Sequence, residues 1–251
     1  MTDREQTTDN VVLLLKGGRL PTWHMLTDAE RGDYERQHVD LMLEVARDAG
    51  LVGLEGFRLM APQQSWERFW TIEFPDMAGA EAWIKAEMAP PYGSFGYYEY
   101  HLSRRFERDF YGSWVTHKPA AVIVDLSGDA RVVPALEADG SSVVMLMFAR
   151  MAPEATRATA DQRGDAEHIG RMRELAAQTD LLRFEAFGLI GPQADWHRAW
   201  IAEFPRIEGA ETWIRGEVQP PHGAYATKEF QLARKWAPGY FALWPAAAQT
   251  P

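Results

Sequence analysis

The stretch LEGFRLMAPQQSWERFWTIEFPDMAGAEAWIKAEMAPPYG, residues 54–93, decides the fold because the chain carries it twice. Residues 184–223 read FEAFGLIGPQADWHRAWIAEFPRIEGAETWIRGEVQPPHG, and the two stretches align without a gap at a separation of 130 residues. In the longer alignment of residues 51–114 with 181–244, 25 of the 64 positions are identical. Self-similarity of this extent indicates a tandem repeat of one domain.

Each copy predicts the same order of elements. The first copy opens with the apolar strand VVLLLKGG, and Thr27 with Glu30 three residues later forms a capping box that begins a helix. Alternating β-branched and aromatic residues predict strands at about 51–60 and 66–74. Asp76 then caps a second helix, PPYG stops it, and SFGYYEYHL is the fourth strand. This is the order of a ferredoxin-like βαββαβ unit.

The repeat also predicts how the chain is organised. A four-stranded sheet with both helices on one face leaves its other face uncovered, and a second copy can cover it. We therefore expect an α+β fold in which two tandem ferredoxin-like repeats form an intramolecular dimeric α+β barrel. The expected repeats are residues 11–117 and 141–245, joined by a Gly-, Pro- and Asp-containing linker at 118–140.

Composition excludes several classes of function. The 251 residues are 46% apolar and 12% aromatic, enough for one large core or two of about 100 residues each. A net charge of -10 without a run of Lys or Arg argues against a nucleic-acid partner. With no cysteine, disulfides, thiolate nucleophiles and Cys-ligated metals are excluded. The polar start MTDREQTTDN and the lack of a long apolar run predict a cytoplasmic protein that makes no membrane contact, as a monomer or small homo-oligomer.

Two histidines and two glutamates recur at equivalent positions. His38, in ERQHVDLML, and His168, in AEHIGRMRE, lie on the apolar stripes of the first helices. Glu87 and Glu217 lie in the last turn of the second helices, where a negative charge meets the unfavourable end of the helix dipole. Both helices of a ferredoxin-like unit cover the same sheet face, so we expect His38 to meet Glu87 and His168 to meet Glu217.

Such a pair has two interpretations. A carboxylate that accepts from one imidazole nitrogen raises the basicity of the other, as a general base or a metal-ligating histidine requires. The alternative is a buried structural pair without chemistry. The strands and the segments before them supply further candidates for substrate binding, and these are Glu55, Trp66, Arg68, Trp70 and Tyr98 in the first copy and Arg183, Glu185, Trp196, Arg198, Trp200 and His222 in the second. The same strand residues could instead form the seam between the two sheets.

The motifs LLLKGG, TWHMLTDAER and RQHVDLMLEVARDAGLVGLEGF resemble the opening of YCII-related proteins, a branch of the dimeric α+β barrel superfamily. The resemblance covers roughly residues 11–105 and 143–235. It implies cyclase, lyase, dehydrochlorinase or cofactor-free oxygenase activity. Where the YCII-related pattern has an Asp-Pro-Phe acid after the second helix, this chain has Glu87 and Glu217.

A second resemblance points to a cofactor. Chlorite dismutases and coproheme decarboxylases are tandem ferredoxin-like chains of similar length, and the helix that carries their haem histidine has an EH…GR pattern similar to AEHIGR here. This resemblance implies His168 as the axial haem ligand and Glu217 as its hydrogen-bond partner. The present chain, however, has an equivalent histidine in both copies.

Our interpretation is an enzyme that binds a mostly apolar, aromatic small molecule and uses a His–Glu pair as acid and base, without a cofactor or metal. The second pair is the preferred site, because Arg183, His197, His222 and Lys228 make its copy more cationic. The alternatives are a haem enzyme that uses His168 and a non-catalytic binding or scaffold protein. No GxGxxG, Walker or HExxH pattern suggests nucleotide-dependent or zinc chemistry.

Overall fold

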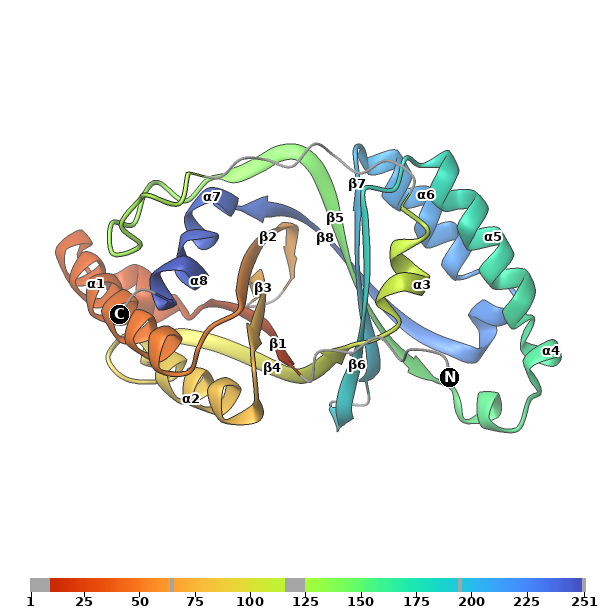
Figure 1. The fold of residues 1–251 in the computed structure, drawn as a ribbon, viewed down its shortest axis with the longest axis horizontal. Coiled ribbons are helices and arrows are strands. Elements are labelled where there is room, and N and C mark those ends of the chain that lie inside the picture. The colour runs from red at the N-terminus through yellow and green to blue at the C-terminus, as the bar shows by residue number, and fades with distance from the viewer. Residues whose placement is uncertain (1–9, 64–65, 116–124, 194–195, 250–251) are drawn as a thin grey trace. The chain divides into compact units, whose positions relative to one another are not determined.

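The order strand, helix, strand, strand, helix, strand occurs twice in the computed structural model of the chain, which describes residues 10–63, 66–115, 125–193 and 196–249 (Figure 1). Two compact units contain these elements. Unit 1 comprises the described residues of 10–104, 125–139 and 235–249, and unit 2 those of 105–115 and 140–234. The α+β class expected from the sequence is confirmed, because each unit combines an antiparallel sheet with helices.

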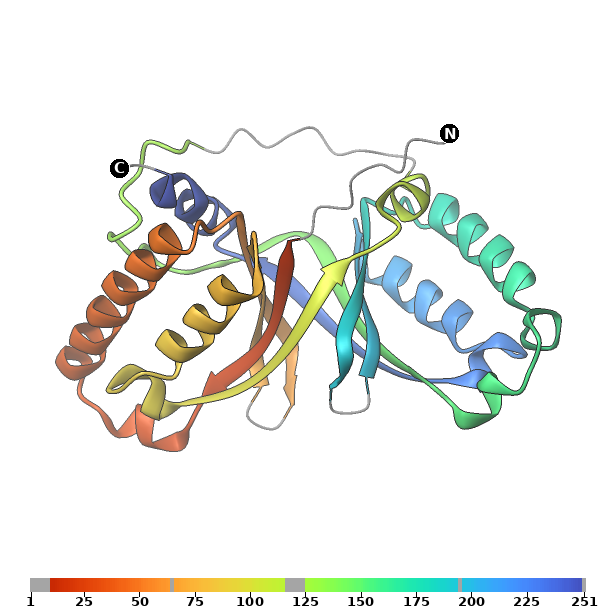
Figure 2. The ribbon, with the colours of Figure 1, turned by 60° about the horizontal axis from the view of Figure 1, so that its bottom comes forward.

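Unit 1 has a four-stranded antiparallel sheet in the order β4-β1-β3-β2. Its main elements are β1 (Val11–Arg19), α1 (Asp28–Asp48), β2 (Gly53–Gln63), β3 (Trp66–Phe74), α2 (Met77–Glu87) and β4 (Gly96–Arg105). Short 3-10 helices, η1 (Pro21–Met25) and η2 (Tyr92–Phe95), precede α1 and β4. Figure 2 shows α1 and α2 side by side along the sheet.

The helix caps of unit 1 are those that the sequence predicts. The Thr27 hydroxyl accepts from the backbone N–H of Glu30, and the Glu30 carboxylate accepts from the N–H of Thr27 at 2.8 Å. Asp76 accepts from the N–H of Gly79 at 3.0 Å and begins α2. Both caps satisfy backbone donors that a helix start leaves unpaired. They determine where each helix begins and therefore which residues face the sheet.

The core of unit 1 lies between the sheet and the two helices. Alternate residues of β1 (Val11, Leu13 and Leu15) meet Met42 of α1 and Trp83 of α2 there. The C-terminal helices α7 (Pro238–Phe241) and α8 (Leu243–Ala248) pack into the same core. The unit therefore combines segments from opposite ends of the chain.

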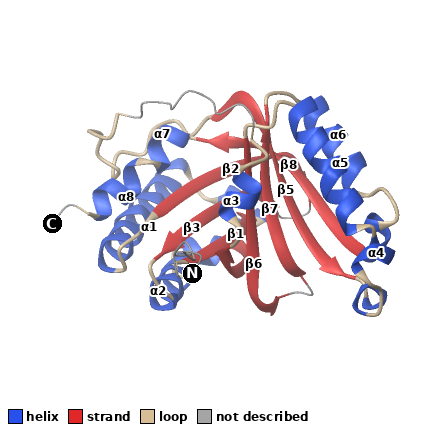
Figure 3. Ribbon diagram, turned by 45° about the vertical axis from the view of Figure 1, so that its right-hand side comes forward, coloured by secondary structure: helices blue, strands red, loops and turns tan. Residues whose placement is uncertain are grey.

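Unit 2 repeats the arrangement with its own sheet, ordered β8-β5-β7-β6. Its main elements are α3 (Arg108–Gly112), β5 (Ala138–Met151), α5 (Asp165–Gln178), β6 (Arg183–Gln193), β7 (Trp196–Phe204), α6 (Ile207–Glu217) and β8 (Ala226–Trp236). Shorter helices are η3 (Pro153–Thr156), α4 (Ala160–Arg163) and η4 (His222–Tyr225). Figure 3 shows α5 and α6 lying along the strands of this unit.

The first helical region differs between the units. Unit 1 has the single 21-residue helix α1, whereas unit 2 has the short α4 followed by the 14-residue α5. Gly164 separates α4 from α5 with a φ of +65°, a left-handed conformation that glycine adopts without steric cost. The break leaves His168 in the first turn of its helix, whereas His38 lies in the middle of α1.

The units are not the continuous ranges 11–117 and 141–245 expected from the sequence. Residues 105–115 belong to unit 2, because Trp114 packs beside Phe184 and Trp213 in the unit 2 core. Residues 235–249 belong to unit 1, where Trp244 packs beside Trp83. Of the expected linker at 118–140, residues 118–124 lie outside the described part of the chain and 125–139 belong to unit 1. Among the helices described, none is long and apolar enough to cross a membrane.

Candidate functional site

The first His–Glu pair of unit 1 is formed between the helices α1 and α2. His38 comes from α1 and Glu87 from the last residue of α2, and His38 Nε2 lies 3.5 Å from Glu87 Oε2. Both side chains are close to nine-tenths buried. The distance is at the limit for a hydrogen bond, as catalytic pairs often are before a ligand binds. Among the described residues, the second ring nitrogen, Nδ1, is buried without a hydrogen-bond partner.

An aromatic ring and an arginine hold the imidazole of His38 in place. Tyr92 stacks on the ring with a centroid distance of 3.9 Å and an angle of 14°. Arg19, at the end of β1, donates to the Tyr92 hydroxyl and lies over the rings of Tyr92 and Trp23 at 3.9 and 4.3 Å. These contacts restrict rotation of His38, so its nitrogens keep their directions.

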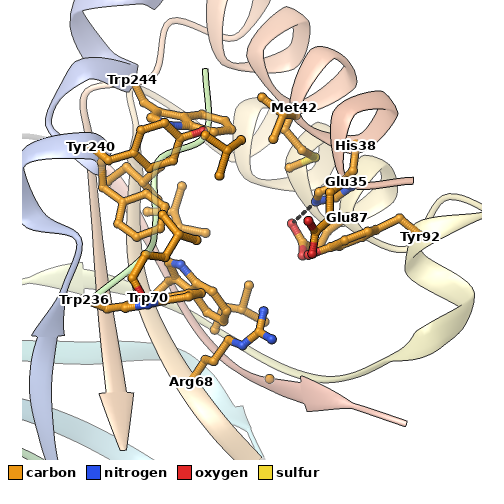
Figure 4. Close-up of a pocket in the computed structure, with 18 of the residues that line it drawn as sticks. Glu35, His38, Met42, Arg68, Trp70, Glu87, Tyr92, Trp236, Tyr240 and Trp244 are labelled. Atoms are coloured by element: carbon orange, nitrogen blue, oxygen red, sulfur yellow. Dashed lines mark hydrogen bonds and ion pairs between the residues drawn. The ribbon is translucent and has the colours of Figure 1, made fainter. Parts of the chain in front are cut away.

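A cavity of about 340 Å³ opens beside this pair, a size typical of small-molecule sites. Figure 4 shows His38 and Glu87 on one side and the aromatic residues Trp70, Trp236 and Trp244 across from them. The strands supply the floor and the C-terminal segment supplies much of the aromatic wall. The cavity therefore combines a large apolar surface with a few polar groups, which is the usual composition of a ligand pocket.

The first cavity is lined by equal numbers of positive and negative side chains. Two arginines (Arg19 and Arg68) and two glutamates (Glu35 and Glu87) line it. Burial, followed by repulsion from Arg68, lowers the pKa of Arg19 to about 10. Burial and the negative charge of Glu87 raise the pKa of Tyr98 to about 12, so this phenol keeps its proton at neutral pH and can donate it in a hydrogen bond.

The second pair has the same spacing in unit 2. His168 comes from α5 and Glu217 from the end of α6, and His168 Nε2 lies 3.5 Å from Glu217 Oε2. Here the acid has a stronger partner: Lys228 of β8 contacts the Glu217 carboxylate and also donates to the Glu217 backbone carbonyl at 2.7 Å. The lysine thus offsets the cost of a negative charge at a helix C-terminus.

Histidine replaces tyrosine beside the second pair. His222, at the position equivalent to Tyr92, stacks on His168 with a centroid distance of 3.8 Å and faces Asp165 at 3.4 Å. Burial and then the neighbouring cations lower the pKa of His168 to about 3 and that of His222 to about 4. Both rings are therefore neutral at pH 7.

The cavity of unit 2 is larger and is lined by more charged side chains. Its volume is about 530 Å³, and α3 with the residues after it closes one side. The cationic side chains on its wall include Arg163 and Lys228, but both are already paired, with Asp165 and Glu217 respectively.

The structure brings only some of the predicted binding residues to these cavities. Those that line a cavity with a His–Glu pair are Arg68, Trp70 and Tyr98 in unit 1 and Arg198, Trp200 and His222 in unit 2. Those that do not are Glu55, Trp66, Arg183, Glu185 and Trp196. These five residues therefore lie outside the two cavities in which the sequence-based expectation would place them.

Strand alternation explains the residues that miss the cavities. Glu55 receives a hydrogen bond from Thr71 on the sheet face that points away from the helices of unit 1. Arg183 pairs with Glu185 at 2.7 Å on the corresponding face of unit 2. Alternate residues of one strand point to opposite faces, so these positions cannot reach the helix side.

The two tryptophans at the start of β3 and β7 need a separate explanation. Trp66 lies against Tyr97 and under the ammonium of Lys16, whereas Arg68, two residues later on the same strand, lines the cavity. Trp196 likewise lies against Phe148. The strand pairing shifts register between Arg58 and Gln63, and simple alternation is lost at such an irregularity.

Sequence reasoning missed several residues of the first cavity, Trp236 among them. Arg19 and Tyr92 support the His38 ring, and Tyr240 and Trp244 form part of the aromatic wall. Tyr92 lies in PPYG directly after the repeated second helix, so the difference between PPYG and PPHG was a usable signal. No sequence signal assigns the C-terminal aromatics to the first copy.

The two ring nitrogens of His168, the haem ligand that the second resemblance implies, lie beside other side chains. The guanidinium of Arg171 can only donate, so His168 Nδ1 accepts from it at 3.3 Å. The ring proton is then on Nε2, facing Glu217. An iron bound by His168 would have to replace the contact of this ring with Glu217 or with Arg171, and His222 covers one face of the ring. Elsewhere in the described residues, no group of three or more histidine, aspartate or glutamate side chains is arranged to hold a metal ion.

The chain resembles solved chlorite dismutases in fold. A mutant of chlorite dismutase from Candidatus Nitrospira defluvii superposes with a TM-score of 0.66 at 10% identity, over 98% of this chain and 97% of that chain. The structure of the same enzyme in complex with imidazole gives a TM-score of 0.64 at 12% identity, over 98% and 97% of the two chains. No family model matches the sequence, and no curated protein matches it. At this identity the likeness establishes the fold, and function depends on the site itself.

Proposed function

We propose that the protein is an enzyme that binds an aromatic small molecule in the unit 1 cavity and moves a proton with the pair His38 and Glu87. The observation that carries the proposal is the buried Nδ1 of His38, which has no hydrogen-bond partner among the described residues and belongs to a ring that lines an aromatic cavity. A buried nitrogen without a partner costs free energy, which a ligand proton can recover.

The chemistry follows from the groups around the cavity. Glu87 would accept a hydrogen bond from Nε2–H of His38 and so hold the tautomer whose lone pair is on Nδ1, the base. Nδ1 would take a proton from a carbon next to a carbonyl, and the electron pair of that C–H bond would move to the carbonyl oxygen. The Tyr98 hydroxyl lines the same cavity and is available to donate to the resulting enolate. Return of the proton to another carbon would complete an isomerisation, and its return to the same carbon would exchange that hydrogen with solvent.

This proposal moves the chemistry from unit 2, which the sequence favoured, to unit 1. Three features support the change. Lys228 forms an ion pair with Glu217, and Arg171 donates a hydrogen bond to His168 Nδ1. The low pKa of His168 makes this histidine a weak base. In unit 1 the position equivalent to Lys228 is Tyr98, which is neutral at pH 7 and leaves Glu87 available to His38.

Deuterium exchange tests the proposal without knowledge of the natural substrate. The probe is 2-tetralone, a planar aromatic ketone with exchangeable hydrogens next to its carbonyl, in D2O with the purified protein. We expect the protein to accelerate exchange, and His38→Gln to reduce that acceleration by about 10²–10⁴-fold because the base is lost. His168→Gln is the matched control and should keep the rate within about threefold, the scatter allowed for an indirect effect.

The competing functions predict different results. For an enzyme with haem bound through His168, added haemin would give an absorption band that His168→Gln removes, and exchange would not depend on His38. For a scaffold protein, the wild-type chain would exchange 2-tetralone no faster than buffer. Either result would overturn the assignment of His38 as base.

A further inference from the structure

We infer that the unit 1 cavity selects planar aromatic carboxylates, with the guanidinium of Arg68 as the group that binds the carboxylate. The inference rests on the proposed function for the location of the site, but it concerns what binds there. Arg68 lies near the start of β3 and projects into the cavity across from His38 and Glu87 (Figure 4). A ligand that spans the cavity would meet a cation at one end and a base at the other.

Arg68 is a cation that the protein neutralises only in part. One terminal nitrogen lies 2.9 Å from Glu67 Oε1, while Nε is buried and has no hydrogen-bond partner among the described residues. The side chain is 18% exposed, so water reaches little of it. A buried donor without an acceptor is costly, and a ligand oxygen that accepts from Nε would remove the cost.

A second cation in the cavity strengthens the case for an anionic ligand. Arg19 lies in the same cavity, and the charge of Arg68 is the largest electrostatic contribution that lowers its pKa. Glu87 and Glu35 act in the opposite direction, but burial and the charge of Arg68 together still keep the pKa of Arg19 lowered. A ligand carboxylate beside Arg68 would reduce the repulsion between the two guanidinium groups.

The aromatic wall defines the rest of the ligand. Trp70 and Trp236 approach each other with centroids 5.7 Å apart, and Arg68 lies over the Trp236 ring at 5.1 Å. The carboxylate site is therefore adjacent to a flat aromatic surface, on which a ligand ring can stack. This geometry favours an aryl carboxylate over a flexible aliphatic acid.

Unit 2 offers a matched control within the same chain. Arg198 is the residue equivalent to Arg68, but it is exposed and lies over Phe106 at 5.1 Å. The repeat therefore retains the arginine in both units while only unit 1 buries it beside the aromatic wall. Replacement of Arg198 removes an equal charge from the protein without affecting the proposed carboxylate site.

Fluorescence titration at neutral pH with two probes tests the inference. The probes are 2-naphthoate, which carries a carboxylate, and 2-naphthamide, which has nearly the same shape and no charge. Binding is measured by quenching of the cavity tryptophans. Wild-type protein should bind 2-naphthoate more tightly than 2-naphthamide, and Arg68→Gln should weaken naphthoate binding by about 10- to 100-fold while changing naphthamide binding by less than about threefold. Arg68→Lys should retain part of the preference, and Arg198→Gln should retain all of it.

Several outcomes would overturn the inference. Equal affinity of the wild-type protein for the two probes would do so, as would an unchanged preference in Arg68→Gln. Loss of naphthoate binding in Arg198→Gln alone would place the carboxylate site in unit 2. His38→Gln separates the two proposals: naphthoate preference with no His38-dependent exchange contradicts only the proposed function, and exchange without the preference contradicts only the role of Arg68.

Discussion

At the residue scale, two substitutions between equivalent positions change what a His–Glu pair can do. Tyr92 and Tyr98 of unit 1 correspond to His222 and Lys228 of unit 2. Lys228 engages the acid of the second pair, and His222 stacks on its histidine. The distance from the histidine Nε2 to the glutamate Oε2 is 3.5 Å in both units. Similar geometry therefore supports a base in one unit and a neutral, fully engaged histidine in the other.

The low pKa values in unit 2 predict a loss of stability in mild acid. In the unfolded chain His168 and His222 have an ordinary pKa of 6.5, whereas folding lowers these values to about 3 and about 4. Below about pH 6.5 the unfolded state binds protons that the folded state does not, so the free energy of unfolding falls as the pH is lowered toward 4. This contribution to stability is fully present above pH 7.

Urea unfolding at pH 7.5 and pH 5.0 measures the effect. We expect the wild-type protein to lose more stability between these two pH values than the double variant His168→Gln/His222→Tyr, which lacks both titrating rings. Carboxylates titrate in both proteins and cancel in the comparison. Equal losses in the two proteins would contradict the lowered pKa values.

At the element scale, short helices from elsewhere in the chain complete each cavity. The helices α7 and α8 cover the sheet of unit 1, and α3 covers that of unit 2. Gly56 of β2 shows how close the contact is, because a Cβ at this position would lie 2.7 Å from the Phe241 ring. These helices therefore contribute to ligand binding as well as to the core.

Replacement of two equivalent tryptophans separates these contributions. Trp244→Ala in unit 1 and Trp114→Ala in unit 2 each remove a buried indole and should each lower the free energy of unfolding by about 3–5 kcal/mol. Trp244 also lines the first cavity, so Trp244→Ala should weaken 2-naphthoate binding by about 3- to 10-fold. Trp114→Ala should leave that affinity unchanged, provided that both variants are titrated at a temperature where they remain folded. A greater effect of Trp114→Ala on binding would contradict the assignment of the C-terminal helices to the unit 1 site.

At the scale of the whole molecule, the repeat made the element order and the two His–Glu contacts predictable. Helix periodicity with the caps at Thr27 and Asp76 was enough to orient His38 toward Glu87. Two features were not predictable. The face of Trp66 depends on a local register shift that periodicity does not encode, and the position of residues 235–249 depends on long-range packing of short helices without a distinctive pattern.

The sequence-based preference for the second pair rested on the charges of the neighbouring residues and not on their contacts. Cationic residues near a site predict stabilisation of a negative charge that develops during the reaction. In the structure Lys228 pairs with Glu217 and Arg183 pairs with Glu185, so these two cations already have partners. Composition around a site indicates which charges are present, but only the contacts show which remain available to a ligand.

The most direct test of the account is an NMR titration of the histidine ring signals with 2-naphthoate. Assignments come from His38→Gln, His168→Gln and His222→Gln, each recorded at pH 7. The account predicts that the ligand shifts the signals of His38 and leaves those of His168 and His222 in place as neutral rings. Shifts confined to His168 and His222, with His38 unchanged, would contradict it and place the ligand site in unit 2.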